Sequence, residues 1–440
     1  MKFAPHTASE IEEMLSVIGL SSLDGLFDQI PPTVRLDGAL ELPDGVSELE
    51  IVEDLRRLAA RNRHLDDLVC FAGAGAYDHH VPSVVWALAA RSEFSTAYTP
   101  YQPELSQGVL QALFEFQSMV CELTGLEVSN ASLYDGATAL VEAVNMARIG
   151  ERGRVLVSEG VDPRMVETLR TYGKGPGYEP EIFEAKDGRG GMPAVGDDVA
   201  AVVVQHPNVL GILEPARELF AAAREGGAKA IQVFDPLSLG VLAPPGELGA
   251  DIAVAEGQSL GNHLAFGGPY LGLIAARMAD VRRMPGRIVG ETVDVDGAPG
   301  YVLTLQAREQ HIRREKANSN ICTNQTLMAI AATIYLGWLG PEGLAEVGRQ
   351  CAAKASYAAA QLSALPGVSM LHPDAPFFKE FSLKVPGRAD RVVDGLVERG
   401  HLGGVPFPRA GEDVLLVAVT ERRTREQIDE LVTAMKEVLE

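Results

Sequence analysis

The sequence predicts an α/β protein built around a mostly parallel sheet with helices on both faces. Short apolar runs alternate with helical segments between Arg154 and Ala276, which is typical of parallel strands that are buried on both sides. A Gly-Gly-Pro turn at Gly267 then precedes a further apolar run, so we expect a late antiparallel strand at the edge of the sheet. The chain has 440 residues, of which 46% are apolar and 22% charged, enough for a large core.

Composition excludes several classes of protein. No apolar run reaches the ~18 residues of a membrane helix, and residues 1–14 do not form a signal sequence. The formal charge of −22 disfavours nucleic acid and anionic membranes as partners. Cys70, Cys121, Cys322 and Cys351 are far apart and form no CxxC pair, so neither a zinc site nor a disulfide framework is indicated. We expect a cytoplasmic protein that acts on small molecules or other proteins.

Three parts are predicted: a helical arm over residues 1–65, a large α/β domain over 66–335 and a small α+β domain over 336–440. Capping boxes at Thr7 and Ser47 open two helices of the arm. In the large domain, the predicted helices are 104–123, 130–148 after a polar turn, 163–172 and 216–225, and the predicted strands are 154–158, 179–185, 199–205, 230–234, 251–255 and 270–276. Residues 286–300 suggest a Gly- and Asp-rich linker. The small domain is predicted to contain helices 343–365 and 388–399, strands 368–372, 380–385 and 413–420, and a last helix opened by a capping box at Thr424.

The turn after the strand at 251–255 is informative because it contains no lysine. In pyridoxal-phosphate enzymes of the aminotransferase class, a lysine at this place binds the cofactor covalently. Here the turn offers Gln258 and Ser259, and no lysine occurs between Lys229 and Lys316. Asp235 follows another strand, where a carboxylate would pair with the pyridinium nitrogen of such a cofactor. Alternatively, Asp235 forms an Asx-turn before Pro236.

The polar turn from Asn130 gives a second indication against an independent cofactor site. It enters a helix whose N-terminus would bind the cofactor phosphate. Asp135 lies in this turn, and its carboxylate would repel a phosphate. His206, after the strand at 199–205, is a further candidate at a strand end. The adjacent His79 and His80 suit a loop better than a metal site.

Two polar loops are candidate binding segments. Tyr98, Tyr101 and Gln102 lie between prolines that hold the chain extended, and they suit a polar substrate pocket as well as a packed turn. Ser319, Asn320 and Thr323 follow a basic cluster that is either a solvated helix face or, with this loop, a site for a phosphate or carboxylate, which a partner could supply. The basic residues are Arg308, Arg313, Arg314 and Lys316.

Five runs closely resemble the glycine cleavage system P-protein family, in particular the amino-terminal half that many bacteria make as a separate subunit. They are FAGAGAYDHHVPSVV, STAYTPYQPELSQG, VCELTGLEVSNASLYDGATAL, FGGPYLG and AREQHIRREKANSNICTNQ. The resemblance covers nearly the whole chain. Asn318 departs from it, since a threonine is expected there.

The resemblance implies a fold-type I pyridoxal-phosphate transferase architecture and the activity of glycine dehydrogenase (aminomethyl-transferring, decarboxylating). The family decarboxylates glycine and transfers the aminomethyl group to the lipoyl group of H-protein. This chain would be subunit 1 of an α2β2 heterotetramer in which subunit 2 carries pyridoxal phosphate on a lysine. We expect Tyr98, Tyr101 and Gln102 to contribute to the substrate tunnel, and Ser319, Asn320 and Thr323 to contact the partner's cofactor phosphate.

Under the same hypothesis, Asp235, Gln258 and Ser259 are relics of a lost site. Two alternatives remain open from the sequence. One is a non-catalytic scaffold subunit, and the other is a self-sufficient pyridoxal-phosphate lyase or transferase with a displaced lysine at Lys229 or Lys316.

Overall fold

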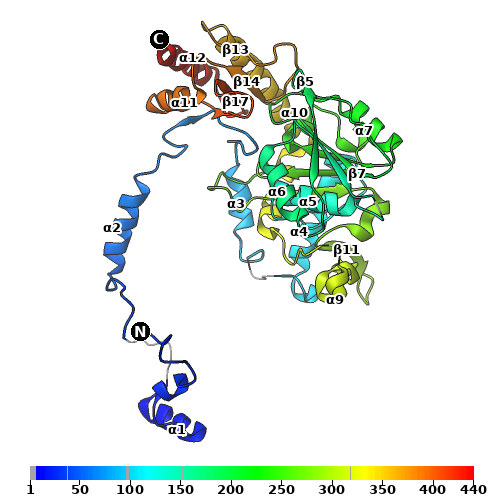
Figure 1. The fold of residues 1–440 in the computed structure, drawn as a ribbon. Coiled ribbons are helices and arrows are strands. Elements are labelled where there is room, and N and C mark those ends of the chain that lie inside the picture. Colours follow the sequence, from blue (N-terminus) through cyan, green and yellow to red (C-terminus); the bar gives the residue numbers. More distant parts are fainter. Residues whose placement is uncertain (1–5, 37, 96–98, 151, 318) are drawn as a thin grey trace. The chain divides into compact units, whose positions relative to one another are not determined.

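The computed structural model describes residues 6–36, 38–95, 99–150, 152–317 and 319–440. The chain divides into two compact units, residues 1–63 and 64–440 (Figure 1). Tyr98 and Asn318 lie outside the described residues. The predicted three-part division, with boundaries at 65 and 335, remains a prediction.

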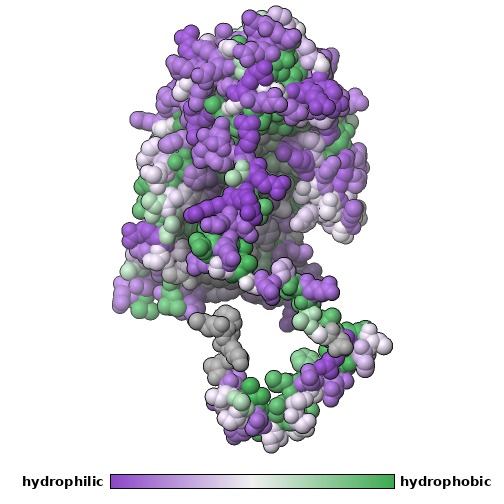
Figure 2. Space-filling model, turned by 90° about the vertical axis from the view of Figure 1, so that its left-hand side faces the viewer, coloured by the Kyte–Doolittle hydropathy of each residue, from purple (hydrophilic) through white to green (hydrophobic). Residues whose placement is uncertain are grey.

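The first unit consists of short helices with almost no core of its own. Its elements are α1 (Ala8–Ile18), η1 (Leu23–Phe27) and α2 (Glu48–Ala59). Both predicted capping boxes are confirmed, with Thr7 and Ser47 as N-caps. Among the described residues of this unit, Leu15 alone is buried, and Figure 2 shows green, hydrophobic side chains at its surface.

The second unit is organised around a seven-stranded sheet with strand order β2-β10-β9-β8-β7-β3-β4. Five adjacent strands, β9, β8, β7, β3 and β4, pair in parallel, and β10 runs antiparallel to both of its neighbours, β9 and β2. The mostly parallel sheet is therefore confirmed. The strands are β2 (Val128–Ser129), β3 (Arg154–Ser158), β4 (Pro180–Phe183), β7 (Val199–His206), β8 (Lys229–Phe234), β9 (Ile252–Glu256) and β10 (Gly272–Ala276).

Helices cover both faces of this sheet because its strands are apolar on both sides. In β8, Ile231 and Val233 pack in a core with α5 and α6, whereas Phe234 faces the core formed with α4 and α10. Ala230 of the same strand packs with α7. These helices are α4 (Gln107–Thr124), α5 (Gly136–Ala147), α6 (Pro163–Gly173), α7 (Ala216–Glu225) and α10 (Thr326–Ser363). Because β3, β4, β7, β8 and β9 run parallel, the loops that follow them lie along one edge of the sheet.

Two details of the sequence-based prediction are wrong. The edge of the sheet is β2, not β10, because Val128 and Ser129 of β2 pair with the outer side of β10. A strand of two residues is too short to show a strand pattern in the sequence. The segment 286–300 is not a linker: β11 (Ile288–Val293) and β12 (Pro299–Thr304) form an antiparallel hairpin. Asp296 and Gly297 lie in its turn, and an Asp-Gly pair between strands is a hairpin signal.

The C-terminal residues form a four-stranded antiparallel sheet with its own hydrophobic core. Its order is β13-β14-β17-β16, and α11, α12 and the end of α10 pack on it. Phe71 also belongs to this core, since β1 (Val69–Cys70) pairs with β15 (His401–Leu402). The elements are β13 (Ser369–Met370), β14 (Glu380–Lys384), α11 (Ala389–Glu398), β16 (Val405–Pro406), β17 (Val414–Ala418) and α12 (Arg425–Leu439).

The remaining described elements are short. They are α3 (Ser83–Ala89), η2 (Pro103–Leu105), β5 (Ala185–Lys186), β6 (Arg189–Gly190), η3 (Pro236–Gly240), α8 (Pro245–Leu248), η4 (Met278–Arg283), η5 (Gln306–Arg308), α9 (Gln310–Arg313) and η6 (Arg314–Lys316).

Helix α10 is the one described helix that is long and apolar enough to cross a membrane. Half of its most apolar window is buried in the fold, and its residues Ala329 and Tyr335 lie in the same core as α4. Gly340, with φ 60°, and Pro341 interrupt the helix. These features are those of a core helix.

Candidate functional site

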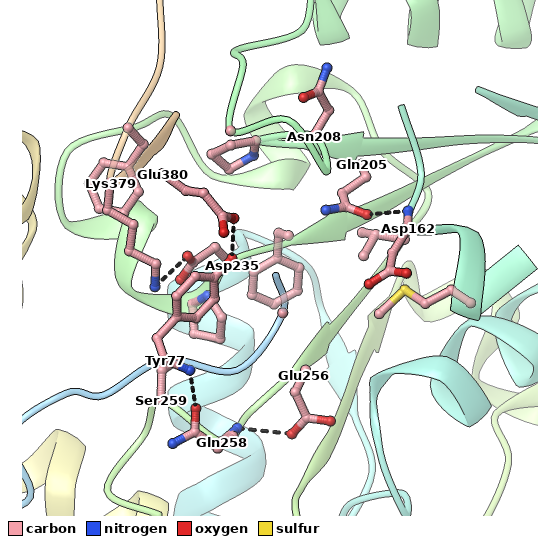
Figure 3. A pocket seen from close by; sticks show the side chains of 18 residues that line it. Tyr77, Asp162, Gln205, Asn208, Asp235, Glu256, Gln258, Ser259, Lys379 and Glu380 are labelled. Atoms are coloured by element: carbon pink, nitrogen blue, oxygen red, sulfur yellow. Dashed lines mark hydrogen bonds and ion pairs between the residues drawn. The ribbon is translucent and has the colours of Figure 1, made fainter. Parts of the chain in front are cut away.

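Polar side chains gather where β8 and β9 end, at the edge of the sheet at which α/β proteins bind ligands. They surround a cavity of about 60 Å³ between the large sheet and the chain around Lys379 (Figure 3). Ligand pockets are usually roughly 300–1,000 Å³. The space is therefore small for an organic cofactor, and the side chains around it explain why.

Asp235 is paired with a lysine of its own chain. Its Oδ2 lies 2.6 Å from Nζ of Lys379, and its Oδ1 accepts a hydrogen bond from the backbone N–H of Leu237 at 3.0 Å. The Asx-turn interpretation is thus confirmed. The carboxylate oxygen that could have faced a pyridinium nitrogen instead faces an ammonium group.

Lys379 is enclosed by aromatic and polar groups. Its side chain is 2% exposed, its Nζ lies 2.9 Å from Nε2 of His79, and it sits 3.7 Å from the centroid of the Tyr77 ring. Figure 3 shows Lys379 and Asp235 pointing toward each other across the pocket. Lys379 was not predicted from the sequence, because it is far along the chain from the strand at 251–255 and no local pattern marks it.

Gln258 uses its amide to close the turn that lacks the lysine. Its Oε1 accepts from the backbone N–H of Tyr77 at 2.9 Å, and its Nε2 donates to the carbonyl of Asn262 at 2.8 Å. Ser259 is also buried, and its Oγ has no hydrogen-bond partner among the described residues. Both residues line the cavity together with Asp235; that the three are relics of a lost site remains a prediction.

The N-terminus of α5 already holds carboxylates. Asp135 is its N-cap and accepts from the backbone N–H of Thr138 at 2.8 Å. Glu256 accepts from the backbone N–H of Gly136 at 3.0 Å through Oε2, and burial raises its pKa to about 7. A helix N-terminus has few free N–H groups to offer an anion, so these carboxylates leave little for a phosphate.

The residues present therefore do not fit pyridoxal phosphate in this chain. Asp235 is already paired with Lys379, the N-terminus of α5 is already bonded to Asp135 and Glu256, and Gln258 cannot form the covalent bond. The two lysines considered from the sequence do not supply it either. Lys229 is paired with Asp280 at 2.8 Å, and Lys316 is exposed in η6.

Other residues around Lys379 form a buried polar network. Tyr77 donates from its hydroxyl to Glu380 at 2.8 Å, and burial raises the pKa of Glu380 to about 7. Burial also raises the pKa of Tyr77, and Glu380 adds to that shift. For His79, burial and Lys379 lower the pKa. Burial opposes ionisation of Glu421, yet hydrogen bonds from His79 and the backbone N–H of His80 bring its pKa to about 2.

His79, Cys351 and Glu421 form the one group among the described residues whose atoms could hold a metal ion. Both nitrogens of His79 are already engaged, Nδ1 with Glu421 at 2.6 Å and Nε2 with Lys379. Burial raises the pKa of the Cys351 thiol to about 12, which disfavours the thiolate that a metal requires. The arrangement favours a hydrogen-bonded network over a metal centre.

His206 does not face this cavity. Its Nδ1 accepts from the backbone N–H of Glu214 at 3.0 Å, and burial lowers its pKa to about 4. Its neighbours Gln205 and Pro207 line the cavity instead. His206 therefore stabilises the strand end and is not a candidate acid or base.

The two polar loops are brought together elsewhere. Arg287 donates to the hydroxyl of Tyr101 and to the carbonyl of Cys322, each at 2.9 Å. Tyr101 is 56% exposed, Gln102 is also exposed, and Thr323 is half-buried. The sequence analysis did not single out Arg287, because nothing in the sequence around it marks a contact with residues near 100 and 322.

Ser319 and Asn320 line a separate cavity of about 560 Å³ beside α5. Glu142 also lines it, and burial raises its pKa to about 7. The Oγ of Ser319 accepts from the backbone N–H of Ile321 at 3.1 Å. Of the three residues predicted to act on a phosphate, Thr323 does not line this cavity.

The basic cluster does not act as one unit. Arg308 donates to the backbone carbonyls of Met284 and Gly286, and burial lowers its pKa. The other three members, Arg313, Arg314 and Lys316, are exposed. Arg308 is therefore a packing residue, and only the other three fit the prediction of a solvated face.

Comparison with solved structures identifies the architecture. A crystal structure of glycine decarboxylase (P-protein) of the glycine cleavage system, in inhibitor-bound form, is 50% identical with a TM-score of 0.92 and full coverage of both chains. A sphingosine-1-phosphate lyase from Burkholderia pseudomallei is 18% identical with a TM-score of 0.66, covering 93% of this chain and 94% of that one. The predicted fold-type I architecture of pyridoxal-phosphate-dependent enzymes is thus confirmed.

Sequence relatives agree over the full length. "Probable glycine dehydrogenase (decarboxylating) subunit 1" from Moorella thermoacetica is 53% identical over all of both chains. The protein of the same name from Chlorobium limicola is 50% identical over 99% of each chain. The family model of the glycine cleavage system P-protein matches residues 1–435. This chain is accordingly a member of the glycine cleavage system P-protein family.

Proposed function

We propose that this chain is subunit 1 of a two-subunit glycine decarboxylase of the glycine cleavage system, and that it completes an active site whose cofactor is bound by its partner. The observation that carries this proposal is that the groups that would bind pyridoxal phosphate in this chain are bonded to its own side chains. Lys379 is paired with Asp235 and Glu256 accepts from the N-terminus of α5, so neither group is free for a cofactor, while the relatives with the same length are named as subunits of the enzyme.

The partner of this proposal is P-protein subunit 2, with a lysine that holds pyridoxal phosphate, in an α2β2 heterotetramer. When bound there, the cofactor supplies the electron sink for decarboxylation. Glycine is the substrate, and the lipoyl group of H-protein accepts the aminomethyl group. The assembly is cytoplasmic and requires neither nucleic acid nor a membrane, in keeping with the charge of −22.

The residues of this chain that reach the partner's site are part of the proposal. Tyr101 and Gln102 are exposed and so free to face the tunnel; Tyr98, which lies outside the described residues, belongs to the proposal on the sequence alone. Ser319, Asn320 and Thr323 contact the partner's cofactor phosphate. Support comes from Arg287, which bonds to Tyr101 and to the carbonyl next to Thr323, so the two loops lie on the same part of the molecule.

Reconstitution tests this function. Carbon dioxide release from glycine would be measured with lipoylated H-protein and with subunit 1, subunit 2 or both. We expect turnover only with both subunits. Turnover by this chain alone would contradict the proposal.

Substitutions then separate a completed site from a scaffold. Tyr101→Phe and Asn320→Ala should lower the rate at least tenfold, about 1.4 kcal/mol of transition-state stabilisation, while the heterotetramer still elutes at its normal size. Val293→Ser is a control, since Val293 is 65% exposed on the hairpin β11–β12. Normal kinetics in both loop variants would reduce this chain to a scaffold.

A further inference from the structure

Arg287 connects two loops that are far apart in the sequence. Its Nη1 donates to Oγ1 of Thr99, and its Nη2 donates to the hydroxyl of Tyr101 and to the carbonyl of Cys322, each at 2.9 Å. Its guanidinium carbon also lies 4.6 Å from the centroid of the Tyr101 ring. One planar side chain therefore sets both the direction of the Tyr101 ring and the distance of that ring from the 319–323 loop.

The backbone of Arg287 is fixed at the turn before α5. Its carbonyl accepts from the backbone N–H of Ala131 at 2.8 Å, and the preceding Pro285 carbonyl accepts from the side chain of Asn130 at 3.0 Å. Asn324, at the end of the 319–323 loop, donates to Ala131 and to the hydroxyl of Ser132. Arg287 thus extends from a rigid base on the sheet toward the exposed tyrosine.

The charged side chain of Arg287 is buried, and burying a charge costs free energy. The side chain is 3% exposed, and the carboxylate of Glu309 lies 3.9 Å from its Nε, beyond hydrogen-bond distance. Nε has no hydrogen-bond partner among the described residues. Glu309 thus pairs with Arg287 through charge alone, whereas three oriented donor contacts give the guanidinium a definite geometry.

We propose that Arg287 is a positioning residue for the divided glycine site. It holds Tyr101 and the 319–323 loop in one arrangement, so that both reach the partner's active site together. This inference rests on the proposed function, and it adds a residue that acts through Tyr101 without touching the substrate. Lysine cannot replace it, because a single ammonium group does not match the fork that serves Thr99, Tyr101 and Cys322.

The test is a double-mutant cycle in the assembled two-subunit enzyme, with kcat/KM for glycine decarboxylation as the readout. Arg287→Lys should lower kcat/KM roughly 10–100-fold, the range expected when a reacting geometry is displaced by about 1 Å. Because Arg287 acts partly through Tyr101 and partly through the 319–323 loop, the double variant Arg287→Lys/Tyr101→Phe should lose clearly less than the product of the two single losses. Kinetics of Arg287→Lys within twofold of wild type, or effects of the two substitutions that multiply, would overturn the proposal.

Two further variants separate positioning from folding. Arg283→Lys is the matched control: Arg283 also binds backbone carbonyls, those of Asn145, Met146 and Arg148, but contacts neither loop in these bonds, so kcat/KM should not change. An equal loss in Arg283→Lys would mean a general effect of removing an arginine. Thr99→Val deletes one acceptor of Arg287 without disturbing the buried charge, and should lower kcat/KM by a few-fold even if Arg287→Lys does not fold. Unchanged kinetics of Thr99→Val in that case would also overturn the proposal.

The same cycle distinguishes the inference from the function on which it rests. If Tyr101→Phe lowers kcat/KM while Arg287→Lys does not, the divided site stands and only the role of Arg287 is lost. If Tyr101→Phe itself is kinetically normal, the assignment of this loop to the glycine site fails, and the role of Arg287 fails with it.

Discussion

The pair between Lys379 and Asp235 should make a large contribution to stability that depends on both partners. Lys379→Met removes the ammonium group but leaves the carboxylate of Asp235, whose side chain is 15% exposed, beside a buried apolar group. Removing one member of a buried ion pair costs roughly 3–5 kcal/mol, since the other charge remains unpaired. We expect a loss of that size in the free energy of unfolding.

Urea unfolding of the full-length chain, followed by circular dichroism, measures this loss. The double variant Lys379→Met/Asp235→Asn removes both charges and should recover much of it. Arg170→Met is the control: Arg170 pairs with Glu179 at 2.9 Å, but the side chains are 44% and 68% exposed, so the expected cost is about 0–1 kcal/mol. A loss below about 1 kcal/mol for Lys379→Met would refute the view that this lysine replaces a cofactor charge in a closed site.

Two other predictions concern buried groups and backbone geometry. Burial raises the pKa of Glu142 from 4.5 to about 7. The folded chain therefore holds a proton that the unfolded chain has lost, and it loses up to about 3 kcal/mol of stability as the pH rises from about 4.5 to 7. Glu142→Gln should flatten the pH dependence of the urea midpoint in that window, and an unchanged profile would contradict the burial argument. Gly211→Ala should be far more destabilising than Gly150→Ala, because a Cβ at Gly211 would lie 1.9 Å from the carbonyl oxygen of Glu380, whereas a Cβ at Gly150 meets nothing within 4 Å. Both glycines have positive φ, so the two variants share a backbone cost of about 1–2 kcal/mol. Similar melting temperatures for the two variants would show that the close approach at Gly211 is not rigid.

Patterns local in sequence predicted the elements well. The capping boxes at Thr7, Ser47 and Thr424 all mark helix starts, since both partners of each box lie within four residues. The parallel strands were also predicted correctly, because each is a short apolar run that can be recognised without distant contacts. By contrast, β2 is only two residues long and pairs with the end of β10. The hairpin at 288–304 was missed because its Gly- and Asp-rich segment was interpreted as a linker, although Asp296-Gly297 is a turn signal.

The missing lysine of the candidate site could be predicted from the sequence, but the side chains that fill its cavity could not. A missing lysine at Gln258 can be read directly from the sequence, because that position follows a recognisable strand. Lys379 and Glu256 could not be assigned in the same way. Each lines the cavity through tertiary contacts, with Asp235 and Gly136 respectively, and no local pattern marks a side chain that fills a pocket.

The most direct test of the divided active site is borohydride trapping of pyridoxal phosphate followed by peptide mass mapping. The purified chain would be reduced with the cofactor alone and then together with subunit 2. The closed site predicts no stoichiometric label on this chain, including on Lys379, and a single label on a lysine of the partner. A stoichiometric label on Lys379, Lys229 or Lys316 would show that this chain binds its own cofactor, and would contradict the central claim.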